Sequence, residues 1–400
     1  MKAFSRLVIA AIGAAAFASC TQNGNLIYLN IQKVTKTNVS TSIPLDITVS
    51  DIVNVGADNS AAPYYVAAGK IYNGTAPVGG TTNWNAISVP QASGKDMLCN
   101  TLTYDPSNHQ LWGGFFSSDG TTYALYWTDP RLPVAWTKLV DNLNPTAQIT
   151  YLNVPSATDR RLFAVVSWMV NGNPVYELDT TQSGSASWNN TGLTSSTKPI
   201  TSVALNGATY YATWGNTLYS APASLYPTLS FSVVLSPGTA PLATNPNDIL
   251  QGIFIDPNYA AGALIAVVAS NQTVNPAVGS VYFSMDGGLT WSNTNTTAST
   301  SYQVGFLCAA GPVDSAHTTY LLGSDSGTGA AFGFFSFVPS SASLTRFKGI
   351  SYSLYASAVR RILVDQANNL VAMGTINNGL WVTLGIDATG GFANSTWTQE

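Results

Sequence analysis

Three aspartates, Asp96, Asp248 and Asp325, carry the side chains with the most chemical potential in this sequence. Hydrolysis of a glycoside uses two carboxyl groups that flank the scissile bond, so a pair of these aspartates could supply them. An aspartate in a turn can instead accept hydrogen bonds from nearby backbone N–H groups. Both interpretations apply to each residue until a fold brings two of them together.

Four aromatic residues are candidates for ligand binding, namely Trp168, Trp214, Tyr352 and Tyr355. Aromatic rings bury apolar area while neighbouring polar groups orient a ligand. Together with the three aspartates, these rings suit a sugar or a protein partner. The alternative for the two tryptophans is that they only cover the edges of strands.

The sequence offers no metal site and implies no cofactor. Its two histidines, His109 and His317, stand alone in expected turns. Cys99 and Cys308 are expected near the starts of strands in two repeats that are not neighbours. Because a disulfide needs Cα atoms within about 7 Å, we interpret both cysteines as small buried hydrophobic residues.

Short strands are the elements that must position these residues. Apolar runs rich in β-branched and aromatic residues alternate with turns, and Asp-Pro starts two of these turns. The pattern occurs at 102–106 before 111–114, at 253–257 before 264–268, and at 362–365 before 370–374. Each repeat is expected to hold an inner strand, two further strands, and an outer strand that starts with an aromatic residue.

The segment 284–291, Ser-Met-Asp-Gly-Gly-Leu-Thr-Trp, predicts a hairpin turn after the apolar run 280–283. An Asp accepts backbone hydrogen bonds in such a turn, the glycines supply unusual backbone angles, and the Trp buries a large ring. The segment resembles the Asp-box of BNR repeats, which occurs in sialidases, sortilin-type receptors and related propellers. Its structural positions are Ser284, Asp286, Gly288, Thr290 and Trp291.

Aromatic residues recur with a period of roughly 50 residues, which is typical of four-stranded propeller blades. The expected outer strands start at Trp84, Trp136, Trp188, Phe231, Trp291, Phe347 and Trp397. Degenerate Asp turns are expected at Asp129, Asp179 and Asp387. The sequence therefore predicts an all-β fold, a seven-bladed β-propeller of four-stranded antiparallel blades. Six or eight blades, a β-sandwich and a β-helix are the alternatives.

The resemblance also implies a catalytic pattern, which this chain lacks. In the family's sialidases, three arginines hold the substrate carboxylate, a Tyr–Glu pair forms the nucleophile, and an Asp is the acid/base. The nearest local match to the early arginine motif is Arg131, in an expected Asp turn on the wrong face. Only Arg360 and Arg361 begin an inner strand, and Glu177 is the sole interior glutamate. In such propellers, blade-to-blade loops share a face with second-to-third-strand loops, where all the candidate rings and aspartates fall.

Composition restricts the partners. Charged residues make up 8% of the chain, and the formal net charge is −4. This argues against nucleic-acid binding, which needs clustered Lys and Arg, and suits an exported all-β protein that is solvated by Ser, Thr, Asn and Gly.

Residues 1–19 are expected to be an export signal, with Lys2 and Arg6 before an apolar core that is too short for a membrane span. The end of this segment resembles a bacterial lipobox, so Cys20 is the expected lipidated N-terminus. The alternative is an ordinary signal peptide that ends near Ala18. Residues 20–46 are expected to form a tether and closing strand, and 47–400 the propeller. A strand at 26–31 or 43–49 is expected to pair with the last blade, because little chain follows Trp397.

Taken together, these features predict an exported, non-catalytic binding protein of the bacterial outer membrane, periplasm or cell surface; secretion without a lipid is the alternative. It is expected to be a monomer that binds a protein or carbohydrate through its loop face and touches the membrane only through the N-terminal lipid. The alternative function is a non-sialidase glycoside hydrolase that uses the three aspartates. In a eukaryotic source, the sequons at Asn73, Asn189, Asn271 and Asn295 become glycan sites.

Overall fold

The computed structural model describes residues 43–75, 84–139, 146–155, 161–170, 173–182, 188–196, 198–226, 229–238, 242–260, 262–271, 273, 278–296, 304–325, 333–347, 354, 357–384 and 396–400. All of them belong to one compact unit, Thr41–Glu400. The expected export signal, Cys20, and the strand expected at 26–31 lie outside the described residues.

Seven four-stranded antiparallel sheets follow one another along the chain. Blades 1 and 2 are β1 (Asp51–Asn54), β2 (Tyr64–Ala68), β3 (Lys70–Gly74), β4 (Trp84–Ala86), and β7 (Leu98–Asp105), β8 (Gln110–Phe116), β9 (Tyr123–Thr128), β10 (Thr137–Lys138). Blades 3 and 4 are β11 (Gln148–Asn153), β12 (Arg161–Val170), β13 (Asn173–Gln182), β14 (Asn189–Ser195), and β15 (Ile200–Asn206), β16 (Thr209–Trp214), β17 (Thr217–Pro222), β18 (Ser232–Leu235).

Blades 5 and 6 are β19 (Ile249–Asp256), β20 (Leu264–Asn271), β21 (Val278–Ser284), β22 (Ser292–Asn295), and β23 (Phe306–Ala310), β24 (Tyr320–Ser324), β25 (Phe334–Val338), β26 (Ser343–Arg346). Blade 7 is β27 (Val359–Asp365), β28 (Leu370–Thr375), β29 (Leu380–Leu384) and β30 (Thr396–Gln399). The chain also forms a hairpin of β5 (Gln91–Ala92) and β6 (Lys95–Asp96) and the 3-10 helices η1 (Gly56–Asn59), η2 (Ala223–Leu225) and η3 (Pro339–Ser341).

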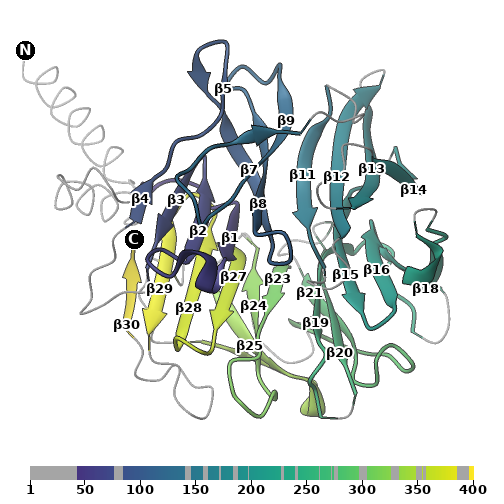
Figure 1. Ribbon diagram of the computed structural model, residues 1–400. Helices are drawn as coiled ribbons and strands as arrows, with labels where there is room; N and C mark the ends of the chain where they lie inside the picture. Colours follow the sequence, from purple (N-terminus) through teal and green to yellow (C-terminus); the bar gives the residue numbers. More distant parts are fainter. Residues whose placement is uncertain are drawn as a thin grey trace, which may run out of the picture. The chain divides into compact units, whose positions relative to one another are not determined.

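The first strand of each blade contacts the first strands of the blades before and after it, and β27 contacts β1. The series of seven blades therefore closes on itself, with the inner strands at the centre (Figure 1). This arrangement is a β-propeller and confirms the predicted seven-bladed, four-stranded antiparallel fold.

The hydrophobic core is divided among the interfaces between neighbouring blades. Each of seven clusters of buried residues combines side chains from two consecutive blades, and one of them joins blade 7 to blade 1. Alternating apolar residues on each strand make this possible, because successive side chains point to opposite faces of a blade. Burial against both neighbours is therefore what stacks the blades radially.

Five of the aromatic residues expected to start outer strands lie at or just before β4, β10, β14, β18 and β22, and Trp397 is the second residue of β30. The expected start of an outer strand at Phe347 is wrong: β26 begins at Ser343 after η3, so Phe347 follows the outer strand.

The Asp turn expected at Asp179 is also wrong, because Asp179 pairs with Asn190 inside β13. Asp129 does form the expected turn, where its carboxylate accepts from the backbone N–H and side chain of Arg131. Asp387 lies outside the described residues.

The segment 284–291 forms a tight turn between β21 and β22. Asp286 Oδ1 accepts from Thr290 N at 2.9 Å and from Leu289 N at 3.1 Å, while Ser284 Oγ accepts from Gly288 N at 2.7 Å. Gly287 and Gly288 have φ of 76° and 103°, which side-chain-bearing residues rarely adopt. These hydrogen bonds lower the pKa of Asp286 to about 2, with the Thr290 hydroxyl as the largest cause.

The expected closing strand at 43–49 is absent. Blade 7 takes all four strands from its own segment, and β30 occupies the outer position. Residues 43–49 instead lie against the β28–β29 turn, where Val49 N donates to Thr375 O and Gly379 N donates to Ile47 O. The propeller closes through side chains and this short backbone contact, because the last residues suffice for an outer strand.

The propeller has two faces, which differ in the connections that they carry. The turn face carries the first-to-second-strand and third-to-fourth-strand turns, including 284–291; the loop face carries the other connections. On the turn face, His317 Nδ1 lies 2.6 Å from Asp256 Oδ2, and His109 Nδ1 lies 2.7 Å from Asp58 Oδ2. Both histidines therefore bridge to the preceding blade, which corrects the expectation that they stand alone.

Among the residues that the structure describes, no helix is long and apolar enough to cross a membrane.

Candidate functional site

The inner strands of the described blades enclose a central channel. A chamber of about 610 Å³ is lined by residues from the inner strands of all seven blades, and it extends to Pro106 and Pro155 at the turn face. A second chamber, of about 310 Å³, is lined by residues near the loop face, among them Tyr176, Pro199 and Ile376. Because the two chambers share lining residues, Tyr151 and Arg361 among them, they form consecutive parts of one channel. We call them the turn-face chamber and the loop-face chamber.

The inner strands share an irregularity at the boundary of the chambers. In six blades the register with the second strand shifts near the start of the inner strand, which is the pattern of a β-bulge. The residues at the bulge are Asn100, Thr150, Thr201, Gln251, Leu307 and Arg360. The residues after them, together with the first residue of β1, are Asp51, Thr101, Tyr151, Ser202, Gly252, Cys308 and Arg361. We call this second set the waist residues.

Four waist residues join their blade to the next one. Asp51 Oδ2 accepts from Leu102 N at 3.1 Å, and Thr101 Oγ1 accepts from Leu152 N at 3.2 Å. The other two follow the same pattern: Tyr151 Oη accepts from Val203 N at 3.4 Å, and Ser202 Oγ accepts from Ile253 N at 3.2 Å. Their polar side chains therefore satisfy the exposed edges of neighbouring inner strands, which is a structural role.

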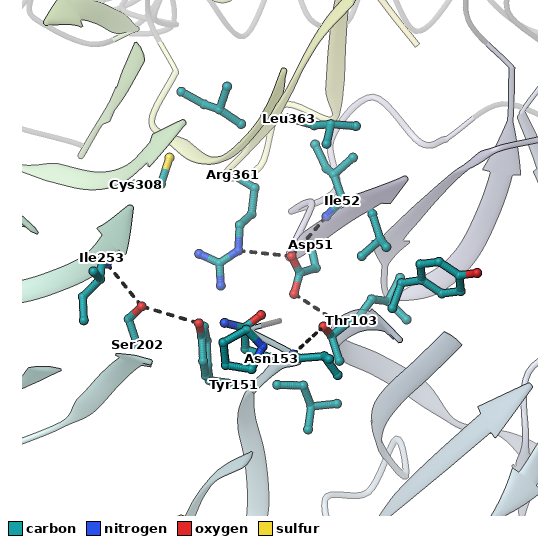
Figure 2. A pocket seen from close by; sticks show the side chains of 18 of the residues that line it. Asp51, Ile52, Thr103, Tyr151, Asn153, Ser202, Ile253, Cys308, Arg361 and Leu363 are labelled. Atoms are coloured by element: carbon teal, nitrogen blue, oxygen red, sulfur yellow. Dashed lines mark hydrogen bonds and ion pairs between the residues drawn. The ribbon is translucent and has the colours of Figure 1, made fainter. Parts of the chain in front are cut away.

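Blade 7 meets blade 1 through an ion pair at the same level. Arg361 Nε lies 3.3 Å from Asp51 Oδ1, and Figure 2 shows Arg361 extending across the cavity toward this carboxylate. Asp51 Oδ2 also accepts from Thr101 Oγ1 at 3.0 Å. Burial works to lower the pKa of Arg361, but the Asp51 carboxylate and other neighbours raise it above its usual value. Asp51 of blade 1 is thus engaged with residues of blades 2 and 7.

The predicted aspartates do not converge. Asp248 is 2% exposed and accepts from Tyr282 Oη at 2.8 Å; burial raises its pKa. Asp325 is 7% exposed and accepts from Ser270 Oγ at 3.3 Å. Asp96 lies on the surface hairpin, 3.7 Å from Lys70 Nζ. None of the three lines the described channel chambers.

The predicted aromatic residues are also separate. Trp168 packs against the cluster between blades 2 and 3, whereas Trp214 packs against the one between blades 3 and 4 and stacks on Tyr219 at 5.5 Å. Both tryptophans are partly exposed near the loop face. Tyr352 and Tyr355 lie outside the described residues.

Two acidic side chains do meet, away from the channel. Glu177 and Asp179 lie on β13 and hydrogen-bond to each other, and burial together with this neighbour raises the pKa of Asp179. Asp179 is 4% exposed. A retaining glycosidase separates its carboxyl groups by about 5 Å and an inverting one by more, so a pair in hydrogen-bond contact does not fit either arrangement.

Sequence reasoning identified Arg360–Arg361 as the arginines that begin an inner strand, and the structure places both at the loop-face chamber. It missed Asp51 and four further waist residues, Thr101, Tyr151, Ser202 and Gly252. Their spacing of roughly 50 residues was the available signal, because the same period relates all blades. A second turn that resembles 284–291 was also missed: Asp119 Oδ1 accepts from Thr121 N and Oγ1, and Ser117 Oγ from Thr122 N, between β8 and β9.

No protein-family model matches the sequence, and no curated protein matches it significantly. Solved structures do match. The WD40 repeats of RRP9 share 9% identity at a TM-score of 0.52, covering 82% of this chain and 87% of that one. The extracellular domain of the putative one component system BT4673 from B. thetaiotaomicron shares 12% at 0.51, covering 89% and 46%.

The GH74 enzyme of Niastella koreensis shares 14% identity at a TM-score of 0.49, covering 85% of this chain and 43% of that one. That score is too low to support an argument about activity. This chain therefore spans less than half the length of the GH74 enzyme and of the BT4673 domain chain. At these identities the likeness shows the fold alone, and the chain is a seven-bladed β-propeller.

Proposed function

We propose that this protein is a non-catalytic binding protein that uses the loop face of its propeller and the channel mouth. The observation that supports the proposal is that the carboxylate of Asp51 is already bound by other residues of the protein. Asp51 is the only acidic residue among the described residues that line the two chambers, and Arg361, Thr101 and Leu102 N occupy it. A glycoside hydrolase needs two free carboxyl groups at one site.

The loop face has the features of a binding surface. The loop-face chamber is within the range of small-molecule sites in volume, and hydroxyl, amide and guanidinium groups line it. Trp168 and Trp214 are partly exposed near the same face. Such a combination supports recognition of a glycan or of a protein side chain.

A direct experiment compares binding with turnover. We expect purified protein to bind members of a glycan array and to leave a panel of chromogenic glycosides intact. Trp168→Ala combined with Trp214→Ala should weaken binding if these rings contribute. Binding that survives the double substitution would keep the function and remove the rings from the site. Turnover that is abolished by Asp96→Asn, Asp248→Asn or Asp325→Asn would establish the hydrolase alternative instead.

We also propose export to a bacterial envelope, with Cys20 as the lipidated first residue. The positive start and apolar core of residues 1–19 support it, and one structural neighbour is an extracellular domain. Mass spectrometry of the mature N-terminus should show an acylated Cys20. An unmodified N-terminus at Ser19 or Thr21 would contradict lipidation.

A further inference from the structure

Arg360 is the residue whose charge the loop-face chamber leaves unbalanced. The chamber's lining holds two charged residues, Arg360 and Arg361, and no acid. Arg361 is paired with Asp51. Among the described residues, the guanidinium of Arg360 has no hydrogen-bond or ion-pair partner, while its backbone carbonyl accepts from Arg361 Nη1.

The bulge explains why Arg360 reaches the channel. A β-bulge leaves one residue unpaired and redirects its side chain, and Arg360 occupies that position in β27. At equivalent positions, Asn100 Nδ2 donates to Ile149 O at 3.0 Å and Thr201 Oγ1 donates to Leu250 O at 2.6 Å. These side chains serve the contact between blades. Arg360 makes no such contact, so its five N–H donors stay available.

Two further donors line the same chamber. The side chains of Gln251 and Tyr176 both border it, and within the described part of the chain neither makes a hydrogen bond. Thr150 and Thr201 already donate to carbonyls, which leaves their oxygens as acceptors only. The available donors therefore come from three blades, 3, 5 and 7, around one cavity.

The electrostatics of the chamber favour an anion. Burial lowers the pKa of Arg360, and the positive charge of Arg361 lowers it further; the more weakly acting Asp51 carboxylate, which is already paired with Arg361, raises it without reversing the shift. A guanidinium nevertheless stays charged in proteins, and a partly buried charge without a partner is unfavourable. An oxyanion in the chamber would supply the missing partner and form charge-assisted hydrogen bonds.

We propose that the loop-face chamber binds a small oxyanion, a carboxylate, sulfate or phosphate group, with Arg360 as the main contact and Gln251 and Tyr176 as further donors. This inference rests on the proposed binding function and names the chemistry of the ligand. The anion could be free or could be the acid group of a sugar, and both present the same oxygens to Arg360.

Calorimetry with galacturonate, galactose, sulfate and phosphate tests the inference. We expect the wild-type protein to bind galacturonate and not galactose. Binding of sulfate and phosphate as well would indicate a free oxyanion, whereas binding of galacturonate alone would indicate an acidic sugar. Absence of binding by all three anions would overturn the proposal.

Three variants locate the site. Arg360→Gln removes the charge and should weaken galacturonate binding at least about tenfold, which corresponds to 1.4 kcal/mol. Arg360→Lys should retain part of the binding, because the charge remains without the planar fork. Arg131→Gln removes the same charge on the turn face, where Arg131 pairs with Asp129, and should bind like the wild type. Equal losses for Arg131→Gln and Arg360→Gln would contradict a specific site.

Thermal stability separates a binding defect from a folding defect. Galacturonate should raise the Tm of the wild type and of Arg131→Gln, but not that of Arg360→Gln. If Arg360→Gln fails to fold, Gln251→Leu provides the second test and should also weaken binding. Galacturonate that binds the wild type and Arg360→Gln equally would overturn the anion site while leaving the proposed binding function intact.

Discussion

We expect the protonation of the Asp179 side chain to make the stability of this protein depend on pH. Burial and the hydrogen bond with Glu177 raise its pKa in the folded state. The folded state therefore keeps a proton that the unfolded chain releases above about pH 4. Since stability falls with pH wherever the folded state binds more protons, Asp179 should make the protein less stable at alkaline pH than at pH 5.

Asp179→Asn removes this titration while keeping a hydrogen-bonding side chain. We expect the substitution to raise the Tm at pH 8 by about 2 °C or more and to change it less at pH 5. Thermal denaturation at both values measures the effect. The exposed Asp96→Asn is the control and should leave the difference between the two pH values unchanged; a Tm for Asp179→Asn that stays below wild type at pH 8 would contradict the assignment.

Residue roles were harder to predict from the sequence than residue positions. Asp96 and Asp248 do lie in blade-to-blade loops, and Asp325 follows a second strand, as the repeat indicated. Their partners were not predictable, because Tyr282 and Ser270 come from different strands. The contact between Asp51 and Arg361 joins the first and last blades, so no local sequence pattern predicts it.

At the scale of the element, aspartate side chains in two turns accept hydrogen bonds from backbone N–H groups that have no partner in a strand. The turns at Asp286 and Asp119 lie on opposite faces, yet both aspartates accept from a Thr N–H and a Thr hydroxyl. The pKa of each carboxyl is lowered to about 2: the Ser117 hydroxyl is the largest cause for Asp119, followed by Thr121, and the Thr290 hydroxyl is the largest cause for Asp286. A lowered pKa contributes stability that is present above the ordinary aspartate value and is lost as the pH falls toward 2.

Asp286→Ala should therefore lower the Tm by a few degrees at pH 7 and have almost no effect near pH 2. The backbone amides of Leu289 and Thr290 should exchange with solvent faster, because they lose their acceptor. Hydrogen exchange followed by mass spectrometry measures this, with Asp119→Ala as the matched variant on the other face. Unchanged exchange at the substituted turn would show that the glycines alone hold it.

The strands themselves were largely predictable. Apolar runs at 102–106, 253–257 and 362–365 end β7, β19 and β27 as expected. Phe347 was misplaced because η3 shortens the connection before β26, and a local 3-10 turn leaves no mark on a period of roughly 50 residues. The bulges were not predicted for a similar reason. One extra residue in a strand does not change the apolar pattern of its sequence enough to be recognised.

For the whole molecule, the interface between blade 7 and blade 1 decides whether the propeller stays closed. On the turn face, Asp365 Oδ2 accepts from Tyr64 Oη and Asn54 Nδ2, both at 2.8 Å. On the loop face, Gln399 Nε2 donates to Leu45 O at 3.2 Å. A buried cluster that includes Ile43 and Val49 lies between them.

Arg361→Met and Asp51→Asn should each destabilise the protein by about 2–3 kcal/mol, because each leaves a partly buried charge without its partner. The double substitution should cost less than the sum of the two, and urea denaturation of all four proteins gives the coupling energy. Additive effects would mean that the ion pair contributes nothing to closure.

The way the propeller closes also has a kinetic consequence. Among the described residues, no strand from one end of the chain belongs to the blade at the other end. Blade 1 and blade 7 of this described part can therefore separate without breaking a strand ladder within either sheet. Native-state hydrogen exchange should therefore find its lowest-energy partial opening at this interface, with Val49 N and Gly379 N exchanging before the inner strands of blades 3 to 5. In physical terms the described blades form a ring that is closed by side-chain contacts and by the short backbone contact of residues 47–49, and we expect its two ends to separate while every blade stays folded.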